Sequence, residues 1–201
     1  MPGLIYRIKF HYKRLFGKKI NIPTYDEKRA VIKQYADEFQ LKTLIETGTF
    51  LGDTVEFFKT KFKKVISIEL SEELATKAIK RFENDDNVTI IKGDSGVELS
   101  HILKGVSEPF LFWLDGHYSH SCNVNGNFIV TGKGDLDTPI EQELRSILST
   151  APKHVILIDD ARCFNGEGDY PSIKLIKKIF LKSGKKYKVV IENDIIRAIP
   201  L

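Results

Sequence analysis

The chain contains few of the residues that hold together small disulfide-rich domains or zinc centres. Only two of its 201 residues are cysteines, Cys122 and Cys163, which excludes a disulfide framework and a cysteine-ligated metal site. No apolar run approaches the roughly 20 residues that cross a bilayer. The basic N-terminus lacks an unbroken apolar core and a small-residue cleavage site, so we expect no signal peptide. Together these absences predict a cytoplasmic protein.

Acidic residues are missing from residues 1–20, which contain six lysines and arginines. The formal net charge of +4 therefore comes from this segment, and the rest of the chain sums to −2. A near-neutral body argues against a nucleic acid as the partner of the main domain. Apolar and basic side chains mix over residues 4–19, which leaves two interpretations open. The segment is either a helix that docks on the domain or a basic amphipathic contact with the periphery of an anionic membrane.

Short apolar segments and amphipathic segments alternate along most of the chain. Strands are expected at 41–47, 64–70, 88–93, 109–115 and 154–160. Helices are expected at 26–39, 53–62, 72–83, 95–104 and 171–182, and a further helix begins at 138–141 and ends near 148. This alternation predicts an α/β fold with a Rossmann-like, doubly wound sheet that is mostly parallel and has helices on both faces.

Two regions depart from the alternation. Residues 187–192 and 195–200 are both strand-like and are separated by a two-residue turn, so we expect a C-terminal antiparallel hairpin. Residues 117–137 are polar and rich in glycine and asparagine, and their length is typical of a lid or a substrate loop. We therefore expect an N-terminal helical basic segment over 1–40 and one domain over 41–201.

A glycine-containing turn follows the first expected strand, in the sequence TLIETGTFLGDT at 43–54. The strand ends at Glu46, and the chain then turns through Gly48 and Gly52 into a helix. Glycine lets the backbone approach a ligand closely, and the free N–H groups at a helix start favour an anionic or polar group. The spacing lacks the G-x-G-x-x-G pattern of nicotinamide-binding folds, which counts against an oxidoreductase.

Acidic residues end the other expected strands. Glu69 ends the second strand about twenty residues after the glycine turn, where an acid can accept hydrogen bonds from both hydroxyls of a ribose. Asp94 follows the third strand, Asp115 ends the fourth, and Asp159 and Asp160 end the fifth. Because the carboxyl ends of parallel strands share one edge of the sheet, we expect these acids to face one ligand site.

With these features the chain resembles the class I S-adenosylmethionine-dependent methyltransferases over residues 41–201. The resemblance rests on ETGTFLG at 46–52, Glu69, GDS at 93–95, LDGHYS at 114–119, IDD at 158–160 and the closing hairpin. Within the class the chain is similar to the small metal-dependent O-methyltransferases, including the sugar-type enzymes of antibiotic pathways, and to the cephalosporin-hydroxylase-like group. The resemblance implies a parallel sheet with one antiparallel strand inserted near its end.

The resemblance also implies S-adenosylmethionine as the cofactor and a role for each matching residue. Glu69 would hold the ribose hydroxyls, and Asp94 with Ser95 would lie at the adenine. Asp115 would face the sulfonium. The residues implied around the methionine part are Glu46, Thr47, Gly48, Thr49 and Gly52.

Asp115, Asp159 and Asp160 form an acidic cluster for which two interpretations stay open. Three carboxylates at one point repel one another unless a cation is present, and oxygen ligands favour Mg²⁺, Ca²⁺ or Mn²⁺ over zinc. The metal-dependent O-methyltransferases that the chain resembles use such a trio to chelate a divalent ion. That ion binds two neighbouring substrate oxygens and lowers the pKa of the hydroxyl to be methylated. In the other interpretation the acids only cap helices, and Asp160 pairs with Arg162.

His117 and Asp115 are the predicted catalytic residues. His117 is the first candidate for the base, because it follows Asp115 by two residues and an imidazole can take up a hydroxyl proton near neutral pH. In the sugar O-methyltransferases that the chain resembles, the base at this place is often an acid instead. His120 is the second candidate. The alternative is a histidine that only orders the loop 117–137.

Three functional hypotheses follow. The first is a S-adenosylmethionine-dependent transferase that methylates a hydroxyl of a small polyhydroxylated molecule, such as a sugar or glycan precursor, with Mg²⁺ or a similar ion orienting the acceptor. The second is a metal-independent N- or O-methyltransferase that uses His117 as base. The third is a cofactor-binding scaffold without chemistry, against which the intact cofactor residues argue. The sequence leaves a homo-oligomer open.

Overall fold

The computed structural model describes residues 22–118, 121–124 and 127–201. The basic segment at 4–19, for which we considered a docking helix and a membrane contact, lies outside these residues, and so does His120. Within the described ranges, no helix is long and apolar enough to cross a membrane.

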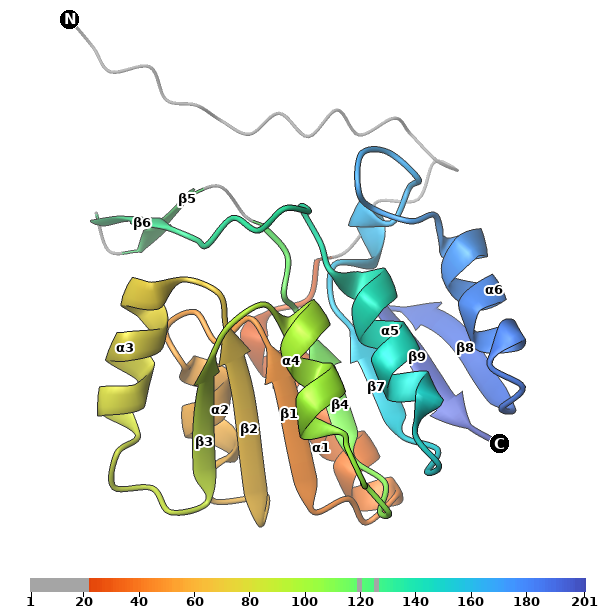
Figure 1. Ribbon diagram of the computed structural model, residues 1–201, viewed down its shortest axis with the longest axis horizontal. Helices are drawn as coiled ribbons and strands as arrows, with labels where there is room; N and C mark the ends of the chain where they lie inside the picture. The colour runs from red at the N-terminus through yellow and green to blue at the C-terminus, as the bar shows by residue number, and fades with distance from the viewer. Residues whose placement is uncertain (1–21, 119–120, 125–126) are drawn as a thin grey trace, which may run out of the picture.

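A seven-stranded sheet runs through the molecule in the order β3-β2-β1-β4-β7-β9-β8 (Figure 1). Its parallel strands are β1 (Thr43–Thr47), β2 (Lys64–Glu69), β3 (Val88–Lys92), β4 (Leu111–Leu114) and β7 (Val155–Ile158). The C-terminal hairpin adds β8 (Tyr187–Glu192) and β9 (Ile195–Pro200), and β9 inserts antiparallel between β7 and β8. The predicted doubly wound, mostly parallel sheet with a C-terminal antiparallel hairpin is thus confirmed.

Both faces of the central strands are buried, because successive side chains enter two different cores. Along β4, Phe112 and Leu114 pack into one core, whereas Leu111 and Trp113 pack into the other. This two-sided burial explains why the central strands are continuous apolar runs in the sequence rather than alternating apolar and polar residues.

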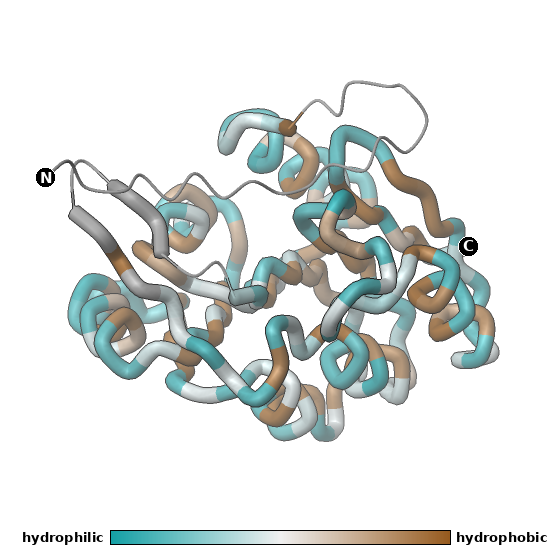
Figure 2. Tube along the Cα trace, turned by 90° about the horizontal axis from the view of Figure 1, so that it is seen from above, coloured by the Kyte–Doolittle hydropathy of each residue, from teal (hydrophilic) through white to brown (hydrophobic). Residues whose placement is uncertain are grey.

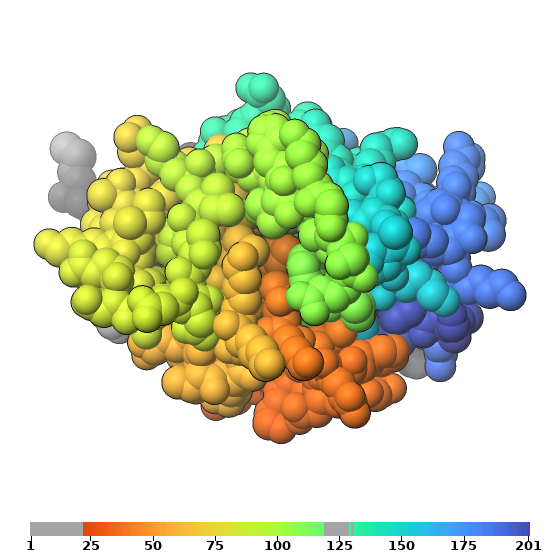
Figure 3. Space-filling view, turned by 60° about the horizontal axis from the view of Figure 1, so that its bottom comes forward, coloured from red at the N-terminus to blue at the C-terminus, as the bar shows by residue number. Residues whose placement is uncertain are grey.

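Helices cover both faces of the sheet, as predicted. On one face lie α1 (Tyr25–Glu38) and α2 (Asp53–Phe58); on the other lie α4 (Ser95–Ile102), α5 (Ile140–Ser149) and α6 (Ile173–Lys182); α3 (Glu72–Arg81) packs beside β2 and β3. Seen from above, the helices alternate hydrophobic and hydrophilic residues along the tube, as amphipathic helices do (Figure 2). In the space-filling view, the orange residues that follow the N-terminal segment lie beside the gold and green parts of the chain (Figure 3).

The segment 117–137 contains a structure that the sequence analysis did not expect. Its residues Ser121–Val124 (β5) and Asn127–Val130 (β6) pair as a separate two-stranded antiparallel sheet. Pairing the two halves of this segment satisfies backbone N–H and C=O groups that an irregular loop of the same length would leave to solvent.

Candidate active site

A pocket of about 580 Å³ opens at the carboxyl ends of the parallel strands, where ligands bind in doubly wound sheets. Its lining includes most of the predicted residues, namely Glu46, Gly48, Thr49, Glu69, Asp94, Ser95, Asp115, His117, Asp159 and Asp160. Thr47 and Gly52 do not line it: Thr47 is buried at the end of β1, and Gly52 is the residue before α2. The strand ends therefore bring most of the predicted cofactor residues and the acidic cluster to one site.

The glycine turn is required by protein contacts as well as by any ligand. Gly48 has a φ of +85°, and a Cβ there would lie 2.5 Å from the backbone oxygen of Asp115. Gly52 has a φ of +81°, and a Cβ there would lie 2.8 Å from the ring of Phe82. Both glycines thus allow positive φ angles and close packing of the turn against its neighbours.

Replacing Gly48 with alanine is expected to lower the free energy of unfolding by more than about 2 kcal/mol, because it adds a clash with backbone to the cost of a positive φ. Gly105→Ala is the matched control, since Gly105 has a φ of +72° and no atom within 4 Å of the added Cβ. Its cost is expected to be about 1 kcal/mol. Urea denaturation compares the two, and equal losses would show that the contact with Asp115 is unimportant.

The carboxylate of Glu69 is held rigidly at the pocket wall. Its Oε2 accepts the backbone N–H of Phe50 at 2.8 Å, and its Oε1 accepts the N–H of Ser71 at 2.8 Å. The side chain is buried yet lines the pocket. Each carboxylate oxygen has a second lone pair, so two further donors can bind to a group whose orientation is already set.

A buried chain of polar side chains lies behind the glycine turn. Ser67 donates to Glu46 Oε2 at 2.6 Å, and the hydroxyls of Thr49 and Ser67 are 2.6 Å apart. Burial raises the pKa of Glu46 to about 8, although the hydrogen bond from Ser67 lowers it in part. Glu46 is therefore mostly a neutral acid at pH 7 in the absence of a cationic ligand.

Asp94 is the N-cap residue of α4 and Ser95 is the first residue of that helix, and both side chains form hydrogen bonds. Asp94 Oδ1 accepts the N–H of Gly96 at 2.8 Å and caps the helix, while Ser95 donates to Glu143 Oε1 at 2.6 Å. The sequence analysis missed Glu143, a buried acid on α5 whose pKa burial raises to about 7. One signal was available: Glu143 lies on the apolar face of its helix, next to Leu144.

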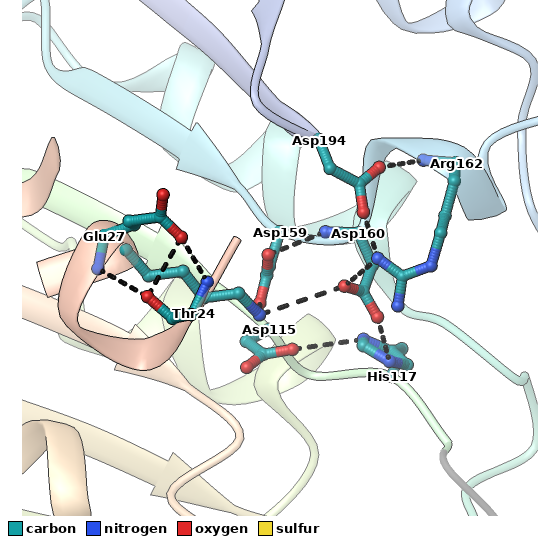
Figure 4. Close-up of polar contacts among 9 residues, drawn as sticks. Thr24, Glu27, Asp115, His117, Asp159, Asp160, Arg162 and Asp194 are labelled. Atoms are coloured by element: carbon teal, nitrogen blue, oxygen red, sulfur yellow. Dashed lines mark hydrogen bonds and ion pairs between the residues drawn. The ribbon is translucent and has the colours of Figure 1, made fainter. Parts of the chain in front are cut away.

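The acidic cluster is held by donor groups from three directions (Figure 4). Asp159 Oδ1 accepts the backbone N–H of Asp160 at 2.8 Å, and its Oδ2 accepts a hydrogen bond from the ammonium of Lys28. Asp160 Oδ1 accepts from Arg162 Nη1 at 2.7 Å, and its Oδ2 lies 3.3 Å from His117 Nε2. The other ring nitrogen, His117 Nδ1, lies 3.3 Å from an oxygen of Asp115.

These contacts shift the titration of the cluster. Burial alone would lower the pKa of His117, but its hydrogen bonds with Asp115 and Asp160 outweigh burial and raise the pKa to about 10. Burial would raise the pKa of Asp160, but His117 and Arg162 lower it to about 2. Burial and the two neighbouring carboxylates raise the pKa of Asp159. His117 is thus a cation held between two acids.

The C-terminal hairpin completes the cluster. Arg162, which follows β7 in a short 3-10 turn (Ala161–Cys163), pairs with the carboxylate of Asp194 as well as with Asp160. Asp194 Oδ1 also accepts the backbone N–H of Arg162 at 2.8 Å. The pairing of Asp160 with Arg162 that the sequence suggested is confirmed, and Asp194 is a partner that it did not suggest.

A divalent cation does not fit the cluster in this arrangement. Among the described residues, no three histidine, cysteine, aspartate or glutamate side chains are placed to hold a metal ion. The ammonium of Lys28 contacts Asp159 and lies 3.9 Å from Asp160 Oδ1. A metal bound by these carboxylates at about 2 Å would have to displace that ammonium.

No family model and no curated protein sequence matches the chain. Similar solved structures include an O-methyltransferase from Bacillus cereus in complex with SAH (TM-score 0.54, 15% identity, 90% of this chain and 84% of that one). Another is the O-methyltransferase TomG from Streptomyces achromogenes, in complex with SAM (TM-score 0.54, 14% identity, 89% of this chain and 82% of that one). A third is the N-methyltransferase NodS from Bradyrhizobium japonicum (TM-score 0.55, 12% identity, 90% of this chain and 89% of that one). The chain therefore has the Rossmann-like fold of the class I S-adenosylmethionine-dependent methyltransferases.

Proposed function

We propose that the protein is a S-adenosylmethionine-dependent methyltransferase that acts on a hydroxyl of a small polyhydroxylated molecule, such as a sugar or glycan precursor. The observation that carries the proposal is the carboxylate of Glu69, whose orientation is fixed by two backbone N–H groups. It stands at the end of β2, beside the glycine turn, in a pocket of a size that suits a small molecule. A nucleoside with two free ribose hydroxyls would complete its hydrogen bonding.

The residues around the pocket suit the other parts of this cofactor. Asp94 lies at the start of α4, where its second carboxylate oxygen can accept from an exocyclic amine. Glu46 and Asp115 place acidic groups along the pocket between β1 and β4, where a positively charged sulfonium and an ammonium would be stabilised. When bound, S-adenosylmethionine supplies the methyl group, activated on its sulfur.

Asp115 is the residue best placed to accept the proton of the acceptor. Its Oδ1 faces His117, whereas Oδ2 has no donor partner among the described residues. The side chain lines the pocket and is partly exposed. A hydroxyl bound at Oδ2 would pass its proton to this carboxylate as the bond from oxygen to the methyl carbon forms and the bond from sulfur breaks. His117, with both nitrogens against acids, would hold Asp115 in place.

The proposed methyl transfer uses no metal, because a divalent cation at Asp115, Asp159 and Asp160 would require Lys28 to leave the cluster. N-methylation is the second candidate activity, because the N-methyltransferase NodS is as similar in fold as the O-methyltransferases. A panel of sugars, catechols and amines offered with radiolabelled cofactor distinguishes hydroxyl from amine acceptors.

Calorimetric titration with S-adenosylhomocysteine tests the cofactor directly. We expect micromolar binding to the wild type and binding about 10- to 100-fold weaker to Glu69→Gln, because charge-assisted hydrogen bonds to the ribose are lost. The control is Glu83→Gln, which makes the same change at an exposed position outside the pocket. An absence of nucleoside binding in the wild type would contradict the proposed function, and equal affinities for all three proteins would remove Glu69 from the site.

A further inference from the structure

We infer that the ammonium group of Lys28 takes the place of a divalent cation among Asp115, Asp159 and Asp160, so that the site binds its methyl acceptor without a metal. The statement about the acceptor rests on the proposed function. The statement about the cation does not, because it concerns only charges and contacts within the chain.

A metal at this cluster would need accessible carboxylate oxygens. Both oxygens of Asp159 and both of Asp160 already face donors, which are a backbone N–H, Lys28, Arg162 and His117. A carboxylate oxygen that accepts a hydrogen bond can still bind a metal. However, a cation and an ammonium cannot share the same point between two acids without strong repulsion. The donors therefore fill the side of the cluster from which a metal would coordinate.

Lys28 is held firmly in its place by the helix that carries it. It lies in the first turn of α1, which a reciprocal cap fixes: Thr24 Oγ1 accepts the N–H of Glu27 at 3.3 Å, and Glu27 accepts the N–H of Thr24 at 2.7 Å (Figure 4). One turn further on, Val31 and Ile32 anchor the helix in the core. The Lys28 side chain is only 18% exposed. It is thus a fixed part of the pocket wall rather than a surface lysine that swings in.

Positive side chains offset the negative charge of the acidic cluster. Lys28 and Arg162 bring two permanent positive charges to a cluster of carboxylates, and His117 lies between two of the acids. The repulsion that makes a trio of carboxylates recruit a divalent ion is therefore already offset. This is the role that the resemblance assigned to a metal, carried out here by side chains from α1 and from the turn after β7.

The consequence for the acceptor follows from Asp115. A chelating metal needs two neighbouring oxygens on the acceptor, whereas the open Oδ2 of Asp115 needs one donor. An acceptor with a single hydroxyl should therefore be methylated as readily as one with two adjacent hydroxyls. A metal-chelating site would reject it.

Titration with Mn²⁺ and Mg²⁺ alone tests whether the cluster binds a divalent cation. Binding is followed by calorimetry and by the electron paramagnetic resonance of free Mn²⁺. The wild type is expected to bind neither ion up to about 10 mM. Lys28→Met should bind Mn²⁺ at least about 10-fold more tightly than the wild type, because the carboxylates lose their fixed counter-charge. Adding Asp159→Asn should abolish that gain. Lys28→Arg, which keeps the charge, and Lys33→Met, which removes an exposed lysine from the same helix, should both behave as the wild type does.

Submillimolar binding of Mn²⁺ by the wild type would overturn the inference. A folded Lys28→Met protein that binds Mn²⁺ no more tightly than the wild type would overturn it as well. If Lys28→Met does not fold, the test rests on Lys28→Arg and the wild type. Submillimolar Mn²⁺ binding by either protein would contradict a cation site that is already filled by a positive side chain. Methyl transfer that survives excess EDTA supports the inference, and transfer that EDTA abolishes contradicts it. Because the titration needs neither cofactor nor acceptor, failure of the proposed function would leave its result intact.

Discussion

Replacing Asp115 with asparagine is expected to lower kcat for methyl transfer about 1000-fold, in the range that loss of a positioned proton acceptor produces. The substitution keeps the size of the side chain but removes the negative charge at the open Oδ2. The backbone N–H of Asp115 donates to Thr47 O at 3.1 Å and does not depend on the side chain, so the end of β4 should be unchanged. The rate is measured at saturating cofactor with the acceptor that the substrate panel identifies.

Two readouts separate catalysis from binding in this variant. S-adenosylhomocysteine has no positive charge on sulfur, so its Kd should stay within about threefold of the wild type, since no charge pair with Asp115 is lost. The control Asp86→Asn removes the same charge from an exposed position outside the pocket and should retain full activity. A fall in activity explained entirely by weaker cofactor binding would show that Asp115 positions the cofactor and does not accept the proton.

Acid is expected to destabilise the fold through His154 by about 3 kcal/mol between pH 6.5 and pH 4. The buried imidazole accepts the N–H of Phe110 on Nδ1 at 2.9 Å, and its Nε2 lies 2.8 Å from Thr150 Oγ1. A second proton on Nδ1 would have to displace Phe110. Burial, helped by the charge of Lys185, accordingly lowers the pKa to about 4. The contribution of His154 to the free energy of unfolding is therefore fully present above pH 6.5. It is lost as the pH falls toward 4, because the unfolded chain takes up a proton at a higher pH than the folded protein does.

His154→Gln isolates this effect, because other groups titrate in the same range. The pKa values of Glu46 and Glu143 are raised, so these acids favour the folded state as the pH falls, but they titrate equally in both proteins. The variant should be less stable than the wild type at pH 7, and urea denaturation should show this gap narrowing by about 3 kcal/mol toward pH 4. The control is His101→Gln, which makes the same change at an exposed histidine. If the difference in stability between the wild type and His154→Gln stayed constant with pH, His154 would take up its proton as readily in the folded protein as in the unfolded chain.

The sequence predicted the sheet well because its signals are local. Apolar runs marked the parallel strands, and the two runs around the turn at Asn193 marked the hairpin to the residue. Acids at the strand ends lie together for a topological reason, since parallel strands end at one edge. Burial of Phe112 and Trp113 on opposite faces of β4 was likewise readable from an unbroken apolar strand.

What the sequence did not predict depends on contacts between distant segments. Lys28 is one of many basic residues on amphipathic helices, and only the packing of α1 shows that it reaches Asp159. The strands β5 and β6 escaped notice because each has only four residues and both lie within the segment 117–137, whose glycines and asparagines are typical of loops. His117 was predicted as a base from its spacing alone, and its two carboxylate partners became visible only when the strand ends were brought together.

The ion pairs of the acidic cluster join the first helix to the turn of the last hairpin, through Lys28, Asp160, Arg162 and Asp194. We expect contacts between such distant parts of the chain to form late in folding, because a large loop must be closed before they are made. A ligand held by these residues stabilises the native state more than the transition state for folding. Occupancy of the pocket is therefore expected to slow the unfolding of the native protein and to change its folding rate little.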